Sequence, residues 1–251
     1  MSDRPHATPL LERLRRWRHA GDMATARACL AQLVHERPAD AVLRRLAWEH
    51  EAFWWEPVRG LRTRLQRRGP DDAELARTCW ADVDFMRRFN RMAVQLPTDD
   101  AELRAVLQRE QAAIISESQA LHWTVERGGR TLGFVSVVNI TMKHRRAEFL
   151  IGLHGDRNPW AGPEASHLAL GFLAKHVGIE RLTAHFYTDN AGAFTAAMKL
   201  GFEVEGTLKA YLRGADGRRF DLVVAGLILD PAFFERTEKL RRRLLGPAAT
   251  L

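Results

Sequence analysis

The chain has 251 residues, of which 46% are hydrophobic and 27% charged, a composition that excludes a disordered chain. Basic residues exceed acidic ones by seven, and the excess lies at the two ends of the chain. Residues 1–68 carry 14 arginines against 8 acidic residues, and residues 236–251 carry 5 basic residues against 1 acidic residue. A nucleic-acid-binding protein usually carries its basic patch on the folded binding domain. We therefore interpret this charge as solvated helical faces and expect no nucleic-acid partner.

The two cysteines, Cys29 and Cys79, have neither zinc-ligand spacing nor the spacing of a disulfide framework, which favours a reducing compartment. The longest apolar run near the C-terminus, residues 222–229, is too short to cross a bilayer. We therefore expect a cytoplasmic protein that requires no metal and has no membrane partner.

Residues 1–56 are predicted to form a small all-α segment of three helices. A turn at Gly21-Asp22 separates the first two helices, Pro38 ends the second, and a third runs from about residue 39 to residue 53. The spacing from Gly21 to Pro38 resembles one tetratricopeptide repeat. Since stable arrays need about three repeats, we expect the segment to pack on the rest of the chain, with recruitment of a protein partner as the alternative. The aromatic residues expected to make this contact are Trp48, Phe53, Trp54 and Trp55.

Near residue 57 the hydrophobic pattern changes, and residues 57–230 are predicted to form one α+β unit with a mixed central sheet and flanking helices. Residues 231–251 are predicted to be a basic C-terminal helix and tail. The predicted strands are 58–68, 122–126, 131–139, 146–153, 182–187, 202–213 and 218–229, the last two joined through the turn 214–217. The predicted helices are one beginning at residue 70 and others at 99–116, 163–177, 190–200 and 231–244.

One segment of this unit carries a recognisable motif. It begins Asn190-Ala191-Gly192-Ala193 and continues through Lys199-Leu200-Gly201-Phe202 to Glu205-Gly206. It resembles the corresponding segment of the GNAT superfamily of N-acetyltransferases, in particular the branch that acetylates the N-termini of ribosomal proteins. The resemblance spans about residues 60–230 and implies acetyl-CoA-dependent transfer to a primary amine, either a protein N-terminus or a small molecule. In this family the residue at Asn190 contacts the pantetheine or substrate side, whereas the local sequence equally predicts a helix N-cap.

The resemblance also implies that residues 158–166 bind the CoA pyrophosphate through backbone N–H groups at a helix N-terminus. Pro163 removes one such donor, and Glu164 is expected to bring negative charge close to the phosphates. The cofactor-binding candidates in this turn are Trp160, Ala161, Gly162, Ala165 and Ser166.

For catalysis, the resemblance points to Glu148, in the segment 147–152, as the base; the alternative is an exposed strand residue beside Arg145 and Arg146. His154 is a second candidate base. The backbone amides of Leu153 and His154 are expected to hold the pantetheine arm. Many family members carry a tyrosine that acts as the general acid, and Ala197 occupies the corresponding position in this chain.

The remaining acid candidate is Tyr187, which could equally be a structural aromatic at a strand end. His176 and His185 are interpreted as structural histidines. The altered phosphate turn and the missing tyrosine leave an alternative function, a catalytically weakened binding module that uses the N-terminal helices for a protein partner.

Overall fold

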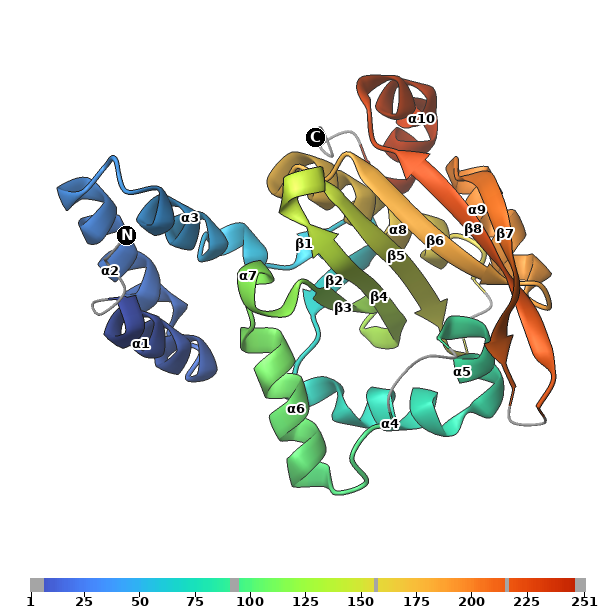
Figure 1. Cartoon of the computed structure of the whole chain (residues 1–251), viewed down its shortest axis with the longest axis horizontal. Helices are drawn as coiled ribbons and strands as arrows, with labels where there is room; N and C mark the ends of the chain where they lie inside the picture. Colours follow the sequence, from blue (N-terminus) through green and yellow to red (C-terminus); the bar gives the residue numbers. More distant parts are fainter. Residues whose placement is uncertain (1–6, 91–94, 156–157, 215–216, 247–251) are drawn as a thin grey trace.

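The computed structural model describes residues 7–90, 95–155, 158–214 and 217–246, and its centre is an eight-stranded mixed sheet (Figure 1). The strand order is β1-β2-β3-β4-β5-β6-β8-β7, in which β5 and β6 pair in parallel and the other neighbours are antiparallel. The predicted α+β class is therefore confirmed. The strands are β1 Val58–Arg59, β2 Thr63–Arg67, β3 Leu121–Arg127, β4 Arg130–Thr141, β5 Arg146–Leu153, β6 Arg181–Tyr187, β7 Glu203–Arg213 and β8 Arg219–Ile228.

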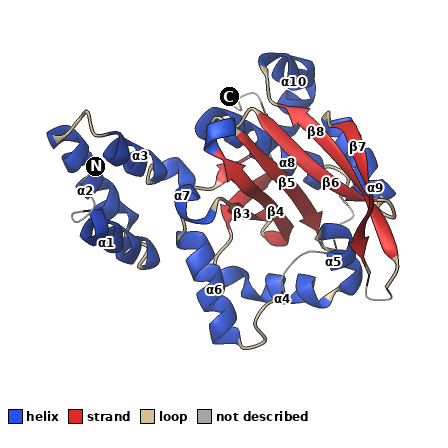
Figure 2. Ribbon diagram, viewed as in Figure 1, coloured by secondary structure: helices blue, strands red, loops and turns tan. Residues whose placement is uncertain are grey.

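Helices cover both faces of this sheet (Figure 2). Helix α8 lies in the main core with α10 packed on it, and α4, α5 and α6 enclose a second core around Phe134 on the other face. None of the described helices is both long and apolar enough to cross a membrane. The helices are α1 Ala7–His19, α2 Met23–Glu36, α3 Ala41–Glu49, α4 Ala73–Ala81, α5 Val83–Phe89, α6 Asp100–Ala112, α7 Ile115–Ser118, α8 Ala161–Phe172, α9 Ala191–Leu200 and α10 Pro231–Leu245.

Some local details differ from the sequence prediction. The single strand expected at 58–68 is divided into β1 and β2 by a tight turn, in which Gly60 donates its N–H to Thr63 O. The short helix α5 was not predicted; it begins where the Asp82 side chain accepts a hydrogen bond from Phe85 N at 2.9 Å. Residues 215–216 of the predicted turn 214–217 lie outside the described part of the chain.

Helices α1 to α3 form the predicted helical segment and lie beside the β1 to β3 side of the sheet (Figure 1). Their core residues Leu14, Leu30 and Leu46 pack with Ile114, which follows α6. Trp54 is 3% exposed and its ring centroid lies 5.6 Å from that of Phe172 on α8. The expected packing of this segment on the rest of the chain is thus confirmed, while its likeness to a tetratricopeptide repeat stays a prediction.

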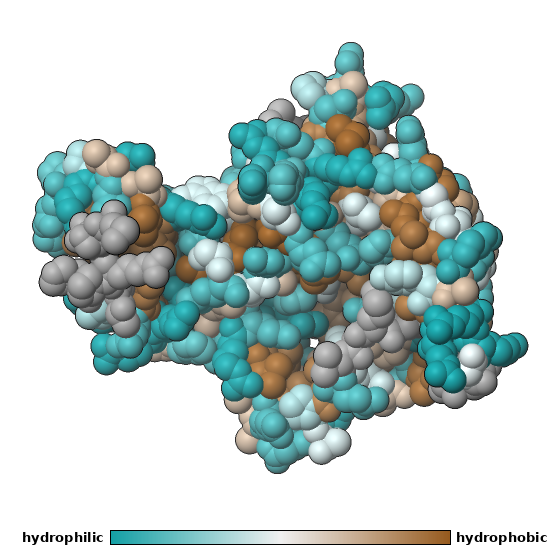
Figure 3. Space-filling model, viewed as in Figure 1, coloured by the Kyte–Doolittle hydropathy of each residue, from teal (hydrophilic) through white to brown (hydrophobic). Residues whose placement is uncertain are grey.

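Hydrophilic residues cover most of the molecular face in Figure 3, but several arginines of the basic ends are not solvated. Arg18 is 3% exposed, and its guanidinium donates to Ala112 O at 2.8 Å and pairs with Glu117 at 2.7 Å. Arg67 is 4% exposed and donates to the carbonyl oxygens of Gln111 and Ala113 at 2.9 and 2.8 Å. The interpretation of this charge as solvated faces is therefore wrong for these side chains, which join the helices to the sheet.

Glu164 fixes the first turn of α8 to the start of the sheet. Its carboxylate accepts hydrogen bonds from Arg62 N at 2.7 Å, from Thr63 N at 3.0 Å and from Thr63 Oγ1 at 2.8 Å, and it forms an ion pair with Arg127. The residue is 2% exposed. Replacing a buried carboxylate that has this many donors by a neutral group lowers the stability of the fold, because all of the donors lose their charged acceptor.

We expect Glu164→Gln to lower the free energy of unfolding by about 3 kcal/mol, because the substitution removes a buried charge and leaves the Arg127 guanidinium, 12% exposed, without its counter-charge. The matched control is Glu180→Gln. Glu180 pairs with Arg145 in a similar ion pair whose two side chains are 62% and 61% exposed, so its loss should cost about 1 kcal/mol or less. Urea unfolding followed by circular dichroism measures both, and equal losses would contradict this account of α8.

Candidate active site

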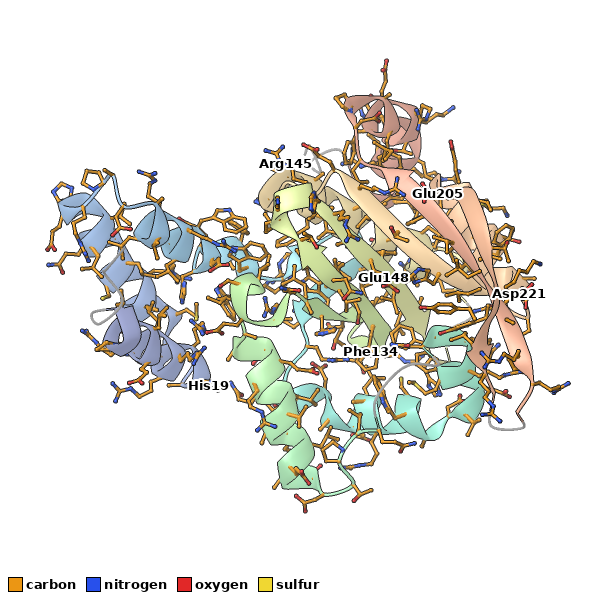
Figure 4. The ribbon with its side chains drawn as sticks, in the orientation of Figure 1. His19, Phe134, Arg145, Glu148, Glu205 and Asp221 are labelled. Carbon is orange, nitrogen blue, oxygen red and sulfur yellow. The ribbon has the colours of Figure 1, made fainter. Side chains whose placement is uncertain are left out.

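The site begins where two neighbouring strands separate. The parallel strands β5 and β6 pair at three positions, ending at Glu148↔Thr183. Beyond this point β5 stays paired with β4 as far as Leu153, and β6 stays paired with β8 as far as Tyr187. The two strands therefore diverge and open a gap in the sheet, and Figure 4 shows Glu148 near the centre of the sheet, where this gap starts.

A cavity of about 590 Å³ fills this gap. Its lining includes the consecutive residues Leu150 and Ile151 of β5 and the consecutive residues Ala184 and His185 of β6. Because successive side chains of a strand point to opposite faces, the cavity passes through the sheet from one face to the other. It can therefore admit two molecules from opposite sides and bring them together at the gap.

Glu148 is held in place by two polar neighbours. One carboxylate oxygen lies 2.8 Å from His185 Nδ1, and the other accepts a hydrogen bond from Asn139 Nδ2 at 3.0 Å. Its side chain is 14% exposed, so it is not the exposed strand residue of the alternative interpretation. Asn139 has a φ of +54°, a conformation that Asn tolerates better than most residues, where the β4–β5 register shifts.

The surroundings of Glu148 favour its charged form. Burial acts to raise the pKa of this carboxyl, but the hydrogen bond and charge of His185 and the hydrogen bond from Asn139 outweigh burial. The net result is a pKa below the usual value of Glu. The carboxylate is thus ionised and able to accept a proton at neutral pH.

His185, interpreted from the sequence as a structural histidine, lies against Glu148. The two residues are 37 positions apart in the chain and meet because of the parallel β5–β6 register. No motif in the sequence indicates such a pairing.

The first turn of α8 lies at one end of the cavity. Three of the cofactor-binding candidates line it, namely Trp160, Gly162 and Ser166. At Gly162 a Cβ would meet nothing nearer than Leu153 Cδ1, at 3.9 Å, so the backbone there is open to close approach. The side chains of Ala161 and Ala165 are instead fully buried in the main core; these residues can contribute through their backbone alone.

Glu164 does not face this end of the cavity. Its carboxylate points into the β1–β2 turn and is neutralised by Arg127, so the expectation that it brings negative charge close to the phosphates is wrong. The positions that precede and follow it on α8, Pro163 and Ala165, point elsewhere because of the helical period.

Two residues that were not selected from the sequence lie near the first turn of α8. His167 lines the cavity, is 1% exposed, and neither of its ring nitrogens has a hydrogen-bond partner. Burial and the nearby Arg241 lower the pKa of His167 to about 4, so its ring is neutral. From α10, the Arg243 guanidinium lies 5.0 Å from the ring centroid of Trp160 and adds positive charge beside the α8 N-terminus.

The two candidates at the end of β5 differ in their environment. His154 N donates to Leu132 O at 2.6 Å, and its ring nitrogen Nε2 lies 3.1 Å from Asp82 Oδ2. Its amide is therefore already used, which corrects the expectation that it holds the pantetheine arm, and its ring holds α5 rather than lining the cavity described here. Because alternate amides of a strand point to opposite sides, the Leu153 amide faces the gap.

Tyr187 and Asn190 both line the cavity, whereas Tyr211 lies on β7 and is 53% exposed. Asn190 is an N-cap of α9, since its side chain accepts from Ala193 N at 3.3 Å, and it also donates to Arg88 O at 3.1 Å. Ala197 lines the cavity without a hydroxyl. Among the described residues, no three His, Cys, Asp or Glu side chains gather as a metal site.

Comparisons with known proteins agree with this geometry. The family model of the acetyltransferase (GNAT) domain matches residues 62–203. An uncharacterised N-acetyltransferase of Bacillus subtilis, YoaA, is 27% identical over 163 residues, which cover 62% of this chain and 88% of the relative.

Solved structures share the fold. A spermidine N-acetyltransferase from Vibrio cholerae in complex with CoA and spermine is 18% identical, with a TM-score of 0.58 over 67% of this chain and 96% of that chain. A probable acetyltransferase of the GNAT family from Chromobacterium violaceum is 20% identical, with a TM-score of 0.57 over 70% of this chain and 92% of that chain. Since the family model covers more than half of the sequence, the chain belongs to the GNAT family of N-acetyltransferases.

Proposed function

We propose that the protein transfers the acetyl group of acetyl-CoA to a primary amine, either a protein N-terminus or a small-molecule amine, by direct attack on the thioester. The observation that carries this proposal is the ionised Glu148 carboxylate, held by His185 and Asn139 at the point where the cavity passes through the sheet. Its position allows a cofactor and an acceptor to meet beside a proton acceptor.

Acetyl-CoA fits the α8 end of the cavity, where it supplies an activated thioester carbonyl. The open backbone at Gly162, the Ser166 side chain and the dipole of α8 favour phosphate binding there, and Arg243 adds a positive charge. The unpartnered nitrogens of His167 offer one donor and one acceptor from a neutral ring. In this proposal the loss of one donor at Pro163 is offset by these side chains.

In the reaction, the amine nitrogen forms a bond to the carbonyl carbon and the bond from that carbon to sulfur breaks. The proton lost by the amine passes to Glu148, directly or through water, while the Leu153 amide polarises the carbonyl oxygen. Tyr187 is the proposed proton donor to the leaving sulfur, although a thiolate can leave without one. The products are the acetylated amine and CoA.

The acceptor is not a polyamine in this proposal. A polyamine carries several positive charges and needs several carboxylates to bind it, whereas Glu148 is the single carboxylate among the described residues that line the cavity. The spermine seen with the Vibrio cholerae enzyme therefore gives no guide to the acceptor here. The resemblance to the ribosomal branch favours a protein N-terminus.

We expect Glu148→Gln to lower kcat by about 10²-fold or more, because the amide cannot accept the proton, while the affinity for acetyl-CoA is unchanged. Calorimetric titration of acetyl-CoA measures the affinity, and thiol release with a panel of amines measures turnover. Glu205→Gln, in an exposed ion pair with Arg181, is the surface control. An unchanged rate would remove Glu148 from the mechanism, and a wild-type protein that binds no acetyl-CoA would overturn the proposed function.

We expect His185→Leu to move the acidic limb of the pH profile of kcat/KM to higher pH. In the wild type His185 helps to hold the pKa of Glu148 below its usual value, so Glu148 stays deprotonated as the pH falls. Without His185 the effect of burial is less opposed, the pKa rises, and Glu148 becomes protonated at higher pH. His185→Gln, which retains a neutral donor, should shift the limb less. If the acidic limb of the pH profile stays at the same pH in both variants, the group that titrates in this limb is not Glu148.

We expect His167→Phe to raise the Kd for CoA up to about tenfold, because the substitution removes one hydrogen bond to the cofactor while keeping an aromatic ring in the core. The control is His176→Phe, since His176 stacks on Phe53 with ring centroids 4.6 Å apart and does not line the cavity described here. Calorimetry on both variants provides the comparison. Equal affinities for CoA in the two variants would assign His167 a purely structural role.

A further inference from the structure

The wall of the cavity opposite α8 carries an unusual set of side chains. On the sheet, Glu148 pairs with Val138, Leu150 with Ser136, and Ser136 with His122, so Glu148, Ser136 and His122 point to one face. Arg68 follows β2 and is placed beside them, because its backbone N–H donates to His122 O at 2.9 Å. We call Arg68, His122, Ser136 and Glu148 the acceptor wall, since α8 and the proposed cofactor site lie on the other face.

Arg68 is a buried cation with an unused donor. Its side chain is 7% exposed, its guanidinium pairs with Glu110 at 2.5 Å and lies 5.3 Å from the ring centroid of Phe134. Its Nε is buried without a hydrogen-bond partner, although Arg68 lines the cavity. Figure 4 shows Phe134 on the sheet between Glu148 and the α4 side of the molecule. A buried charged donor without an acceptor lowers the stability of the fold. Such a donor is expected where the acceptor is supplied by a bound ligand.

Positive charges lie close to this wall. Burial first, and then the charges of Arg68 and Arg67, lower the pKa of His122 to about 3, so the His122 ring is neutral and lies 3.0 Å from Ser136 Oγ. The exposed Arg88 adds a second cation at the mouth of the cavity. Asp72, which also interacts with Arg68, accepts a hydrogen bond from Gly69 N at 2.8 Å and does not line the cavity described here. The wall thus offers cationic and neutral donors, with Glu148 as its carboxylate.

We infer that the acceptor substrate carries an oxyanion, a carboxylate or a phosphate, in addition to its amine, and that Arg68 with the His122–Ser136 pair binds this oxyanion while the amine lies at Glu148. The inference rests on the proposed function and names its substrate class. Arginine presents several N–H groups in a planar fork that suits carboxylate and phosphate. The opposite signs of Arg68 and Glu148 orient such an acceptor with its amine toward the thioester.

The test compares matched acceptors that differ in one charged group. The pairs are the C-terminally amidated dipeptides Ala-Glu-NH₂ and Ala-Gln-NH₂, with Ala-Lys-NH₂ as the cationic member, and glucosamine 6-phosphate with glucosamine. Amidation removes the terminal carboxylate, which would otherwise give every dipeptide an oxyanion. In the wild type we expect kcat/KM to be about tenfold or more higher for the anionic member of at least one pair. The peptide arm and the sugar arm distinguish a carboxylate from a phosphate as the group that is bound.

Two variants separate recognition from structure. Both Arg68→Gln and Glu110→Gln break the same ion pair, so a purely structural role predicts similar effects on the two proteins. Recognition predicts different effects. Arg68→Gln abolishes the preference for the anionic acceptor. Glu110→Gln retains or increases this preference, because Arg68 keeps its charge and loses its counter-charge. Equal effects of the two variants on the anionic-to-neutral ratio would overturn the inference.

A measurement on the wild type keeps the inference testable if Arg68→Gln does not fold. Glutarate should inhibit acetylation competitively against the amine and not against acetyl-CoA, and glutaramide should inhibit at least tenfold more weakly. Inhibition by the two compounds at similar concentrations would overturn the inference. So would turnover of neutral and anionic acceptors at the same kcat/KM, whereas absence of turnover with every amine would count against the proposed function itself.

Discussion

The divergence of β5 and β6 after Glu148↔Thr183 is the constraint on which the site depends. If β5 and β6 were paired along their whole length, their facing N–H and C=O groups would bond to each other, and no passage would connect the two faces of the sheet. Once the strands separate, the backbone groups that face the gap, including the Leu153 amide, lack a strand partner, and buried groups of this kind require one. A molecule with its own donors and acceptors can supply that partner. The gap therefore selects an extended polar ligand and positions it beside Glu148.

Because the cavity crosses the sheet, its two ends belong to different structural layers and have different chemistry. At the α8 end, a helix N-terminus, a neutral His167 and the stacked Arg243 favour an anion with little side-chain obstruction at Gly162. At the other end, the acceptor wall combines a buried cation with one carboxylate. Glu164 takes part in neither end, since four donors hold its charge in the β1–β2 turn and so keep the start of α8 in position.

The sequence was sufficient for the features that depend on local patterns. Strand alternation and helix caps predicted the mixed sheet and most element bounds, and motif resemblance selected Glu148 and Asn190, which both line the cavity. It was insufficient where the outcome depends on pairing between distant segments. His185 reaches Glu148 through the β5–β6 register, and Arg68 joins the acceptor wall through β3. The direction of Glu164 could not be read either, because it depends on how α8 rotates against the sheet.

The basic charge of the N-terminal segment also has a different meaning once the fold is known. Arg18 of α1 is buried against α6 and α7, and its charge acts on Arg67 to lower the pKa of that guanidinium, although burial of Arg67 is the larger cause. Burial first, and then Arg68 and Arg67, lower the pKa of His122 on the acceptor wall. Arg18 and Arg67 both donate to carbonyl groups of residues 111–113, so these two buried cations join α1 and β2 at the end of α6. The helices that look like an attachment in the sequence are therefore fixed to the strand that precedes Arg68 of the acceptor wall.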